Sequence, residues 1–269
     1  MLSRMLLLFV TIMELFAMPA FASDLVLLHA AGSLRGALTE VAQAFEKSSP
    51  LKVQAKFGAS GLLRDDIAAG AKAEVFASAN MEHPQALANA KRSGPVVLFA
   101  RNRLCALVRP GLAVTRETLL DRMLDPQIKL GTSTSKADPS GDYAFEAFSK
   151  AEAVRPNART ILESKALQLT GGAASAVPPG GRSAYGWHIA EGRADIFIVY
   201  CTAARDAEKE NPGLQTIALQ DAFAVGADYG LTVMAEASPS AYQFAMFILS
   251  SEGQRILAAY GFSVPGLPE

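Results

Sequence analysis

The sequence predicts an α/β protein of two lobes, each built from a mostly parallel sheet that helices flank. Strand-like apolar runs alternate with helix-like stretches almost from end to end of the 269 residues, which is typical of parallel sheets covered by helices. Two β-rich stretches, near 96–108 and 214–234, suggest that the chain crosses twice between the lobes and forms a hinge there. Half of the residues are hydrophobic, enough for a sizeable core.

On this interpretation lobe I comprises residues 23–100 plus 225–269, and lobe II comprises residues 101–224. A single doubly wound domain would show the same alternation of strands and helices, so it stays open as an alternative.

The first lobe begins with a strand at 25–31, LVLLHAA. A helix follows, because Leu34, Leu38 and Val41 recur at helical spacing. The remaining elements expected before the first crossing are a strand at 52–57, a helix at 61–70 that Gly70 ends, a strand at 73–79 and a helix from Met81.

The middle of the chain carries two expected strands, VVLFA at 96–100 and LCALVRP at 104–110. The elements expected after them are helices at 118–124, 141–151 and 183–192 and strands at 128–132, 195–200, 214–220 and 224–234. One or two amphipathic helices at 240–261, closed by Gly261, end the chain.

The first 22 residues have the three parts of a secretory signal: Arg4 near the start, an apolar stretch, and the ending Ala20-Phe21-Ala22. A membrane anchor is the alternative, but the stretch is short for a spanning helix, which needs about 20 apolar residues. We therefore expect cleavage after Ala22 and a protein free in the periplasm.

Composition excludes some partners and leaves the cysteines open. With 25 Lys and Arg against 26 Asp and Glu, the net charge is −1, so we expect no nucleic-acid partner. An exported protein can bridge Cys105 and Cys201, but both lie in apolar runs, and we favour buried free thiols. The histidines are far apart and neither cysteine lies in a C-x-x-C motif, so we expect no metal-ion site.

Small and hydroxyl residues mark four strand-to-helix junctions, where ligands of open α/β sheets bind. The junctions are Gly32-Ser33, Ser60-Gly61, Pro139-Ser140-Gly141 and Gly180-Gly181-Arg182-Ser183. Helix starts present free N–H groups to anions, but serine is also a preferred helix cap. Capping and an anion site both stay open, with Ser183 interpreted as a cap.

Enzymatic motifs are missing from these junctions. In Gly58-Ala59-Ser60-Gly61-Leu62, leucine stands where a nucleophile elbow requires glycine. The sequence contains neither a Walker-type lysine loop nor G-x-G-x-x-G. We expect a binding protein that is not an enzyme and uses no cofactor, with a secreted serine hydrolase using Ser33 or Ser60 as the remote alternative.

Five segments occur in an order that resembles one family. They are AAGSLRGAL, FGASGLL, AEVFASAN, DPSGDYAFEAF and ADIFIVYCTAA. Together they resemble the motifs of the periplasmic molybdate-binding proteins of ABC importers, over residues 27 to about 263. The resemblance implies a two-lobed type II periplasmic binding fold that clamps molybdate or tungstate between its lobes and delivers it to the permease subunits of an ABC transporter. We expect a monomer.

The resemblance also implies five ligands, which contact the oxyanion oxygens without coordinating the metal atom directly. They are Ser33, Ser60, Ser140, Arg182 and Tyr200. Both first-lobe serines would donate from hydroxyl and backbone, Ser140 and Arg182 from the backbone N–H, and Tyr200 from its hydroxyl. A fully deprotonated oxyanion only accepts hydrogen bonds, so a set of donors suits it.

Three positions depart from the family's usual residues. Arg182 replaces a valine, Glu74 replaces an aspartate, and Ala204 replaces an aspartate. The arginine side chain would bring a charge that the usual site lacks. Another oxyanion such as sulfate therefore stays open as the ligand.

Overall fold

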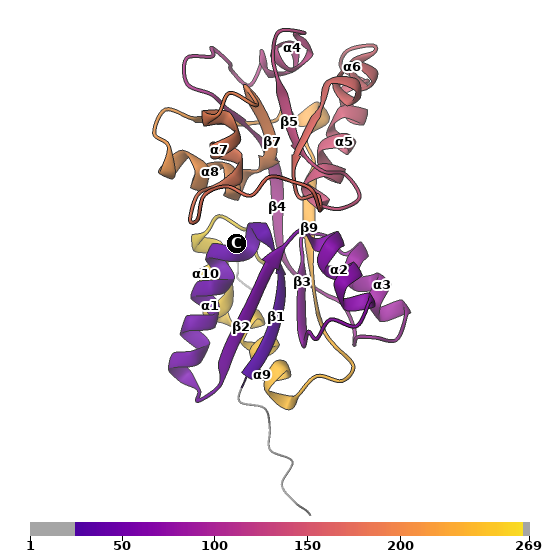
Figure 1. Ribbon diagram of the computed structural model, residues 1–269, viewed down its shortest axis with the longest axis vertical. Helices are drawn as coiled ribbons and strands as arrows, with labels where there is room; N and C mark the ends of the chain where they lie inside the picture. Colours follow the sequence, from indigo (N-terminus) through magenta and orange to yellow (C-terminus); the bar gives the residue numbers. More distant parts are fainter. Residues whose placement is uncertain (1–24, 266–269) are drawn as a thin grey trace, which may run out of the picture.

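The computed structural model describes residues 25–265 and shows a two-lobed α/β fold in which two bodies of helices and strands are joined through a narrow middle (Figure 1). The signal peptide predicted at 1–22 lies outside the described residues. The elements of lobe I are β1 (Leu25–Ala31), η1 (Gly32–Leu34), α1 (Arg35–Ser48), β2 (Lys52–Gly58), α2 (Ser60–Ala68), β3 (Val75–Ser78), α3 (Glu82–Asn89), β9 (Gly226–Val233), α9 (Pro239–Leu249) and α10 (Ser251–Ala259).

Lobe II lies between the two crossings of the chain. Its elements are α4 (Leu119–Leu124), β5 (Leu130–Ser133), α5 (Pro139–Ala151), α6 (Ala158–Lys165), β6 (Leu167–Thr170), α7 (Ala184–Ala190), β7 (Ile196–Tyr200), α8 (Cys201–Glu210), β8 (Gln215–Ala218) and η2 (Asp221–Phe223). α6, β6 and α8 were not predicted from the sequence. α8 begins directly after β7 without a turn signal.

One strand, β4 (Val97–Val108), belongs to both lobes. Residues 97–103 pair with β9, whereas residues 104–108 pair with β7. The complete order is β2-β1-β3-β9-β4-β7-β5-β6, with β8 also on β4. Pairing is parallel within β1–β3 and within β5–β7, as predicted, and antiparallel at β4 and β9, which carry the chain between the lobes. The boundaries proposed at 100/101 and 224/225 stay a prediction.

The continuity of β4 corrects the two separate strands expected at 96–100 and 104–110. The intervening Arg101, Asn102 and Arg103 are exposed, buried and exposed in turn, which is the alternation of an extended strand. Three polar residues in a row resemble a loop in sequence, but here the middle one is turned into the protein.

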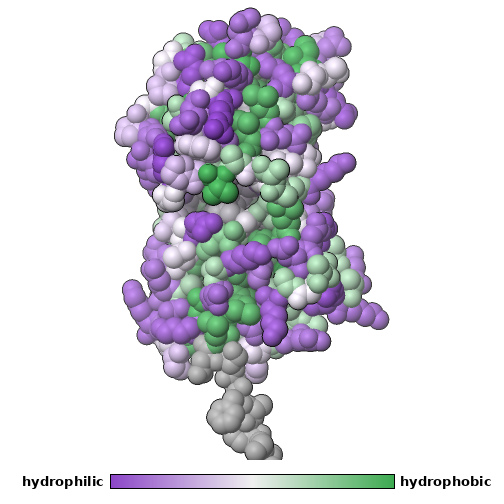
Figure 2. All heavy atoms as spheres, viewed as in Figure 1, coloured by the Kyte–Doolittle hydropathy of each residue, from purple (hydrophilic) through white to green (hydrophobic). Residues whose placement is uncertain are grey.

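Buried apolar faces hold the helices on the sheet. In α1 the buried residues include Leu38, Val41 and Phe45, at the spacing that places side chains on one helix face. Phe45 packs against Phe244 of α9, with ring centroids 5.2 Å apart. Hydrophilic residues cover much of both lobes on the face seen in Figure 2. Within residues 25–265, no helix has the length and apolarity that a membrane span requires.

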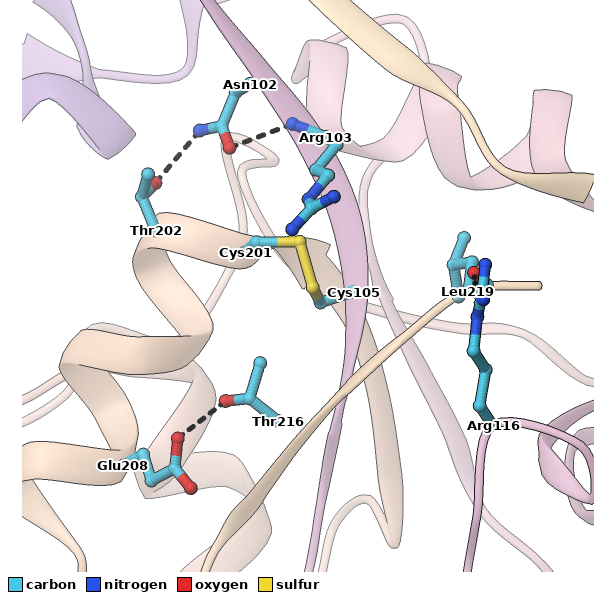
Figure 3. The surroundings of a disulfide bond; sticks show 9 residues. All are labelled: Asn102, Arg103, Cys105, Arg116, Cys201, Thr202, Glu208, Thr216 and Leu219. Atoms are coloured by element: carbon cyan, nitrogen blue, oxygen red, sulfur yellow. Dashed lines mark hydrogen bonds between the residues drawn. A yellow bond between two sulfur atoms is a disulfide. The ribbon is translucent and has the colours of Figure 1, made fainter. Parts of the chain in front are cut away.

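Cys105 and Cys201 form a disulfide, so the preference for buried free thiols was wrong (Figure 3). Their Cα atoms lie 4.8 Å apart. The antiparallel pairing of β4 with β7 sets Cys105 opposite Val199, and Cys201 follows two residues later at the start of α8. Both are buried, as their apolar surroundings in the sequence indicated. Their proximity is long-range: 96 positions separate them.

Candidate functional site

Ser33 and Ser60 lie at the same edge of the lobe I sheet. β1 and β2 are parallel neighbours, with Ala31 opposite Gly58 at their ends, and each serine follows two residues later. Neither hydroxyl caps a helix: η1, α1 and α2 begin without a side-chain cap bond. Helix capping, the alternative left open by the sequence, therefore does not explain these two hydroxyl groups.

The Ser60 hydroxyl is buried and accepts a hydrogen bond from the backbone N–H of Ala79 at 3.1 Å. A backbone N–H can only donate, so the Ser60 oxygen is the acceptor in this pair and its own proton remains available. The Ser33 hydroxyl lies 2.9 Å from the hydroxyl of Tyr229 on β9. The hydroxyl of each first-lobe serine thus has one hydrogen-bond partner within the protein.

Ser140 reaches the site from lobe II, in the first turn of α5. Its backbone N–H, the group expected to bind the anion, donates to Oδ1 of Asp138 at 3.1 Å. Asp138 caps α5 and Pro139 occupies the first turn, an arrangement typical of helix starts. The Ser140 hydroxyl is buried without a hydrogen-bond partner among the described residues, and such groups are rare. The hydroxyl, more than the N–H, is the donor that a ligand would satisfy.

Tyr200 ends β7 and is almost completely buried. Its hydroxyl donates to the carbonyl of Ala79 at 3.4 Å, so Ser60 and Tyr200 contact the same residue from different lobes. Its ring packs edge-on against Tyr143 and Tyr229, at 6.4 Å and 5.6 Å between centroids. Burial raises the pKa of Tyr200 well above its ordinary value, so its hydroxyl keeps its proton and can donate at neutral pH.

Arg182 lies apart from these contacts, in the loop between β6 and α7. Its side chain is exposed, and its backbone N–H donates to the carbonyl of Pro179 at 3.2 Å, within the same loop. The role of Arg182 as a ligand stays a prediction. Its neighbour Ser183 caps α7 by accepting from the N–H of Gly186 at 3.4 Å, which confirms the interpretation of Ser183 as a cap.

The lobes touch beside these residues. The N–H of Gly61, at the start of α2, donates to the carbonyl of Ala137 in the loop before α5, at 3.0 Å. A Cβ atom on Gly61 would lie 2.6 Å from that carbonyl oxygen, so only glycine permits this approach. Gly61 follows Ser60 and Ala137 lies three residues before Ser140, so the contact brings the two junctions together.

One acidic and one basic residue lie beside candidate ligands in the sequence and have notable surroundings. Desolvation by the surrounding protein raises the pKa of the Asp138 carboxyl to about 6, although the residue as a whole keeps partial exposure. In lobe I the guanidinium of Arg35 lies 4.8 Å from the ring centroid of Phe57, a cation–π contact that joins the segments carrying Ser33 and Ser60.

Asp138, Ala79 and Tyr229 were not predicted from the sequence. The Asp-Pro pair before a helix is a cap signature that would have located Asp138. No local pattern marks Tyr229, because its partner Ser33 is 196 positions away. Ala79 acts through its backbone, which sequence does not reveal. Among the described residues, no cluster of three or more His, Cys, Asp or Glu could hold a metal ion.

The two-lobed α/β architecture is the type II periplasmic binding fold, which is the fold of a class of solute-binding proteins. Membership follows from the sequence itself. The chain belongs to the bacterial extracellular solute-binding protein family, whose profile matches residues 26–263.

Two curated relatives lie at different distances. An uncharacterized protein of Pasteurella multocida is 35% identical over 203 residues, covering 75% of this chain and 84% of that protein. The molybdate-binding protein ModA of Mycobacterium tuberculosis is 23% identical over 259 residues, covering 92% of this chain and 87% of its own.

Solved structures agree on the fold and differ in ligand. The periplasmic molybdate-binding protein of Azotobacter vinelandii superimposes with a TM-score of 0.71 at 19% identity, covering 91% of this chain and 100% of its own. The sulfate-binding protein SubI of Mycobacterium tuberculosis gives a TM-score of 0.72 at 19% identity, covering 90% and 87%. At these identities the likeness is one of fold.

Proposed function

We propose that this protein binds molybdate or tungstate between its lobes in the periplasm and delivers the oxyanion to the permease of an ABC transporter. The observation that carries the proposal is the meeting of Ser60 and Tyr200 at Ala79. Ser60 has a proton to donate, and Tyr200 would redirect its hydroxyl from the Ala79 carbonyl to the ligand. The buried Ser140 hydroxyl lies at the start of α5, and the Gly61–Ala137 hydrogen bond links the loop before α5 to the start of α2.

Donors without a proton acceptor suit an anion that carries no proton. Molybdate and tungstate are fully deprotonated at neutral pH, so every ligand oxygen accepts. Hydrogen bonds to an anion are stronger in a site shielded from water. The ModA relatives and the Azotobacter structure favour molybdate within this chemistry, and the SubI structure makes sulfate the second candidate.

Calorimetric titration of the protein lacking residues 1–22 tests the proposal. We expect molybdate and tungstate to bind with 1:1 stoichiometry, more tightly than sulfate, and hydrogenphosphate to bind weakly. If sulfate binds and molybdate does not, the ligand of this protein is sulfate and not molybdate. Failure of all four anions to bind would overturn the function itself.

The same titration tests the site through Ser140→Ala. Removal of this hydroxyl should weaken molybdate binding by about 1–3 kcal/mol, because one ligand oxygen loses its donor. The unfolding midpoint of the ligand-free variant should not fall, since the hydroxyl makes no hydrogen bond within the described residues. Ser183→Ala is the matched control: its hydroxyl caps α7, so it should lose stability and keep affinity.

A further inference from the structure

A buried polar chain lies behind Ser33, at the point where β4 and β9 pass between the lobes. The Tyr229 hydroxyl lies 2.9 Å from Ser33 Oγ and 3.3 Å from Nδ2 of Asn102. Tyr229 is completely buried and Asn102 is 8% exposed. Polar groups at such depth are costly unless their hydrogen bonds are satisfied, so the arrangement of these three groups is tightly constrained.

The direction of the chain follows from a backbone group. The N–H of Arg103 can only donate, and it donates to Oδ1 of Asn102 at 2.9 Å. That contact fixes which end of the Asn102 amide is oxygen and which is nitrogen. Nδ2 therefore donates, to Oγ1 of Thr202 at 2.9 Å and to the Tyr229 hydroxyl. Figure 3 shows Asn102 on β4 between Arg103 and Thr202, beside the disulfide.

The Tyr229 oxygen, which accepts from Asn102, then has one proton to donate. In the 2.9 Å contact with Ser33 either hydroxyl could be the donor. Donation by Tyr229, the direction that our proposal takes, makes Ser33 the acceptor and leaves the Ser33 proton for a ligand. Burial raises the pKa of Tyr229, which keeps the phenol protonated and able to donate. In that arrangement Ser33 would match Ser60, whose oxygen accepts from the Ala79 N–H.

We propose that Asn102 and Tyr229 are positioning residues that hold the Ser33 hydroxyl as a hydrogen-bond donor and so make the site selective for oxyanions whose oxygens carry no proton. The inference rests on the proposed function. An anion with a P–OH group needs an acceptor. A Ser33 oxygen that accepts from Tyr229 has one lone pair left instead of two, and its proton is free to donate to the ligand. The selectivity of a ligand serine is thus set by residues that do not touch the ligand.

A double-mutant cycle tests whether Tyr229 acts through Ser33. Wild type, Tyr229→Phe, Ser33→Ala and the double variant are titrated with molybdate, sulfate and hydrogenphosphate. We expect Tyr229→Phe alone to weaken molybdate binding about 10-fold, and to change it less than about 2-fold in the Ser33→Ala background. It should weaken hydrogenphosphate binding less than molybdate binding, because the freed Ser33 hydroxyl can then accept.

Controls separate positioning from folding. Tyr242→Phe makes the same chemical change at an exposed position on α9 and should leave the affinity for every anion unchanged. Phe at position 229 keeps the ring packed against Tyr200 and Phe262. If Tyr229→Phe fails to fold by circular dichroism, Asn102→Ala replaces it in the same cycle, since it removes the donor that orients the Tyr229 hydroxyl.

The outcomes divide cleanly. If wild type binds none of these anions, the proposed function fails and this inference fails with it. If wild type binds molybdate and Tyr229→Phe costs the same factor with and without the Ser33 hydroxyl, the function stands and the positioning role is overturned. Unchanged affinity in Tyr229→Phe overturns it as well.

Discussion

Asp138 is a carboxyl group held at a helix N-terminus and shielded by protein. Its Oδ1 accepts the Ser140 N–H at 3.1 Å, which favours the ionised form, and Asp142 on the same helix opposes ionisation. Desolvation is the largest effect and leaves the pKa raised to about 6 from 3.8. Because the folded protein binds a proton that the unfolded chain has released, stability contributed by this group is complete below pH 3.8 and is lost as pH rises through 6.

Asp138→Asn should therefore stabilise the protein at pH 7.5. The amide oxygen can still accept from Ser140, whereas the charge is gone, and a shift of this size corresponds to about 1–3 kcal/mol. At pH 3.5 both forms are neutral and the difference should vanish. Urea unfolding of the two proteins at both pH values measures it. A gain that is equal at pH 3.5 and 7.5 would show that charge is not its cause.

At the scale of elements, β4 and α8 are joined twice, by the Cys105–Cys201 disulfide and by the Asn102–Thr202 hydrogen bond (Figure 3). α8 begins directly after Tyr200. The two contacts therefore fix the backbone next to Tyr200, a candidate ligand residue, against β4, the strand shared by both lobes. A crosslink between residues 96 positions apart also restricts the unfolded chain. A disulfide is consistent with an exported protein.

Replacing both cysteines by alanine should lower the free energy of unfolding by about 2–4 kcal/mol, as loss of a bridge over a long loop predicts. Guanidinium unfolding under oxidising conditions measures the loss. A reducing agent should shift wild type toward the variant and leave the variant unchanged. Two free thiols found by titration of the oxidised, unfolded wild type would contradict the bridge.

Local patterns in the sequence located most elements, and long-range pairing accounts for what they missed. The spacing of apolar residues in the sequence predicted β1, α1 and β7. Burial is nearly continuous along the two strands and recurs at helical spacing along α1. The break predicted in β4 arose because Asn102 is buried by partners on β9 and α8, which lie 127 and 100 positions away. The disulfide and the Ser33–Tyr229 bond are hidden for the same reason. Ser33, Ser60, Ser140 and Tyr200 were predicted as ligands from the order of motifs and stay a prediction, whereas the groups that contact them have no motif.

At the scale of the whole molecule, ligand binding would depend on how closely the two lobes approach. Gly61 and Ala137 bring the lobes within one backbone hydrogen bond, 3.0 Å long. Closure around a ligand is favoured only by contacts that the open form lacks. The Gly61–Ala137 hydrogen bond is a candidate for a contact that forms only in the closed form. A Cβ atom at position 61 would lie 2.6 Å from the Ala137 oxygen, so a side chain there would force the lobes apart or strain the backbone.

Gly61→Ala should accordingly weaken molybdate binding about 10-fold or more, because the variant must bind with the lobes separated or strain the backbone at 136–137. Gly94→Ala is the matched control, since a Cβ there would meet the Val233 oxygen at an ordinary 3.6 Å. X-ray scattering should show a larger radius of gyration for Gly61→Ala than for wild type at saturating molybdate, at equal unfolding midpoints. Wild-type affinity in Gly61→Ala would mean that the lobes need not meet here for the ligand to be held, and the site would then have to be built from one lobe alone.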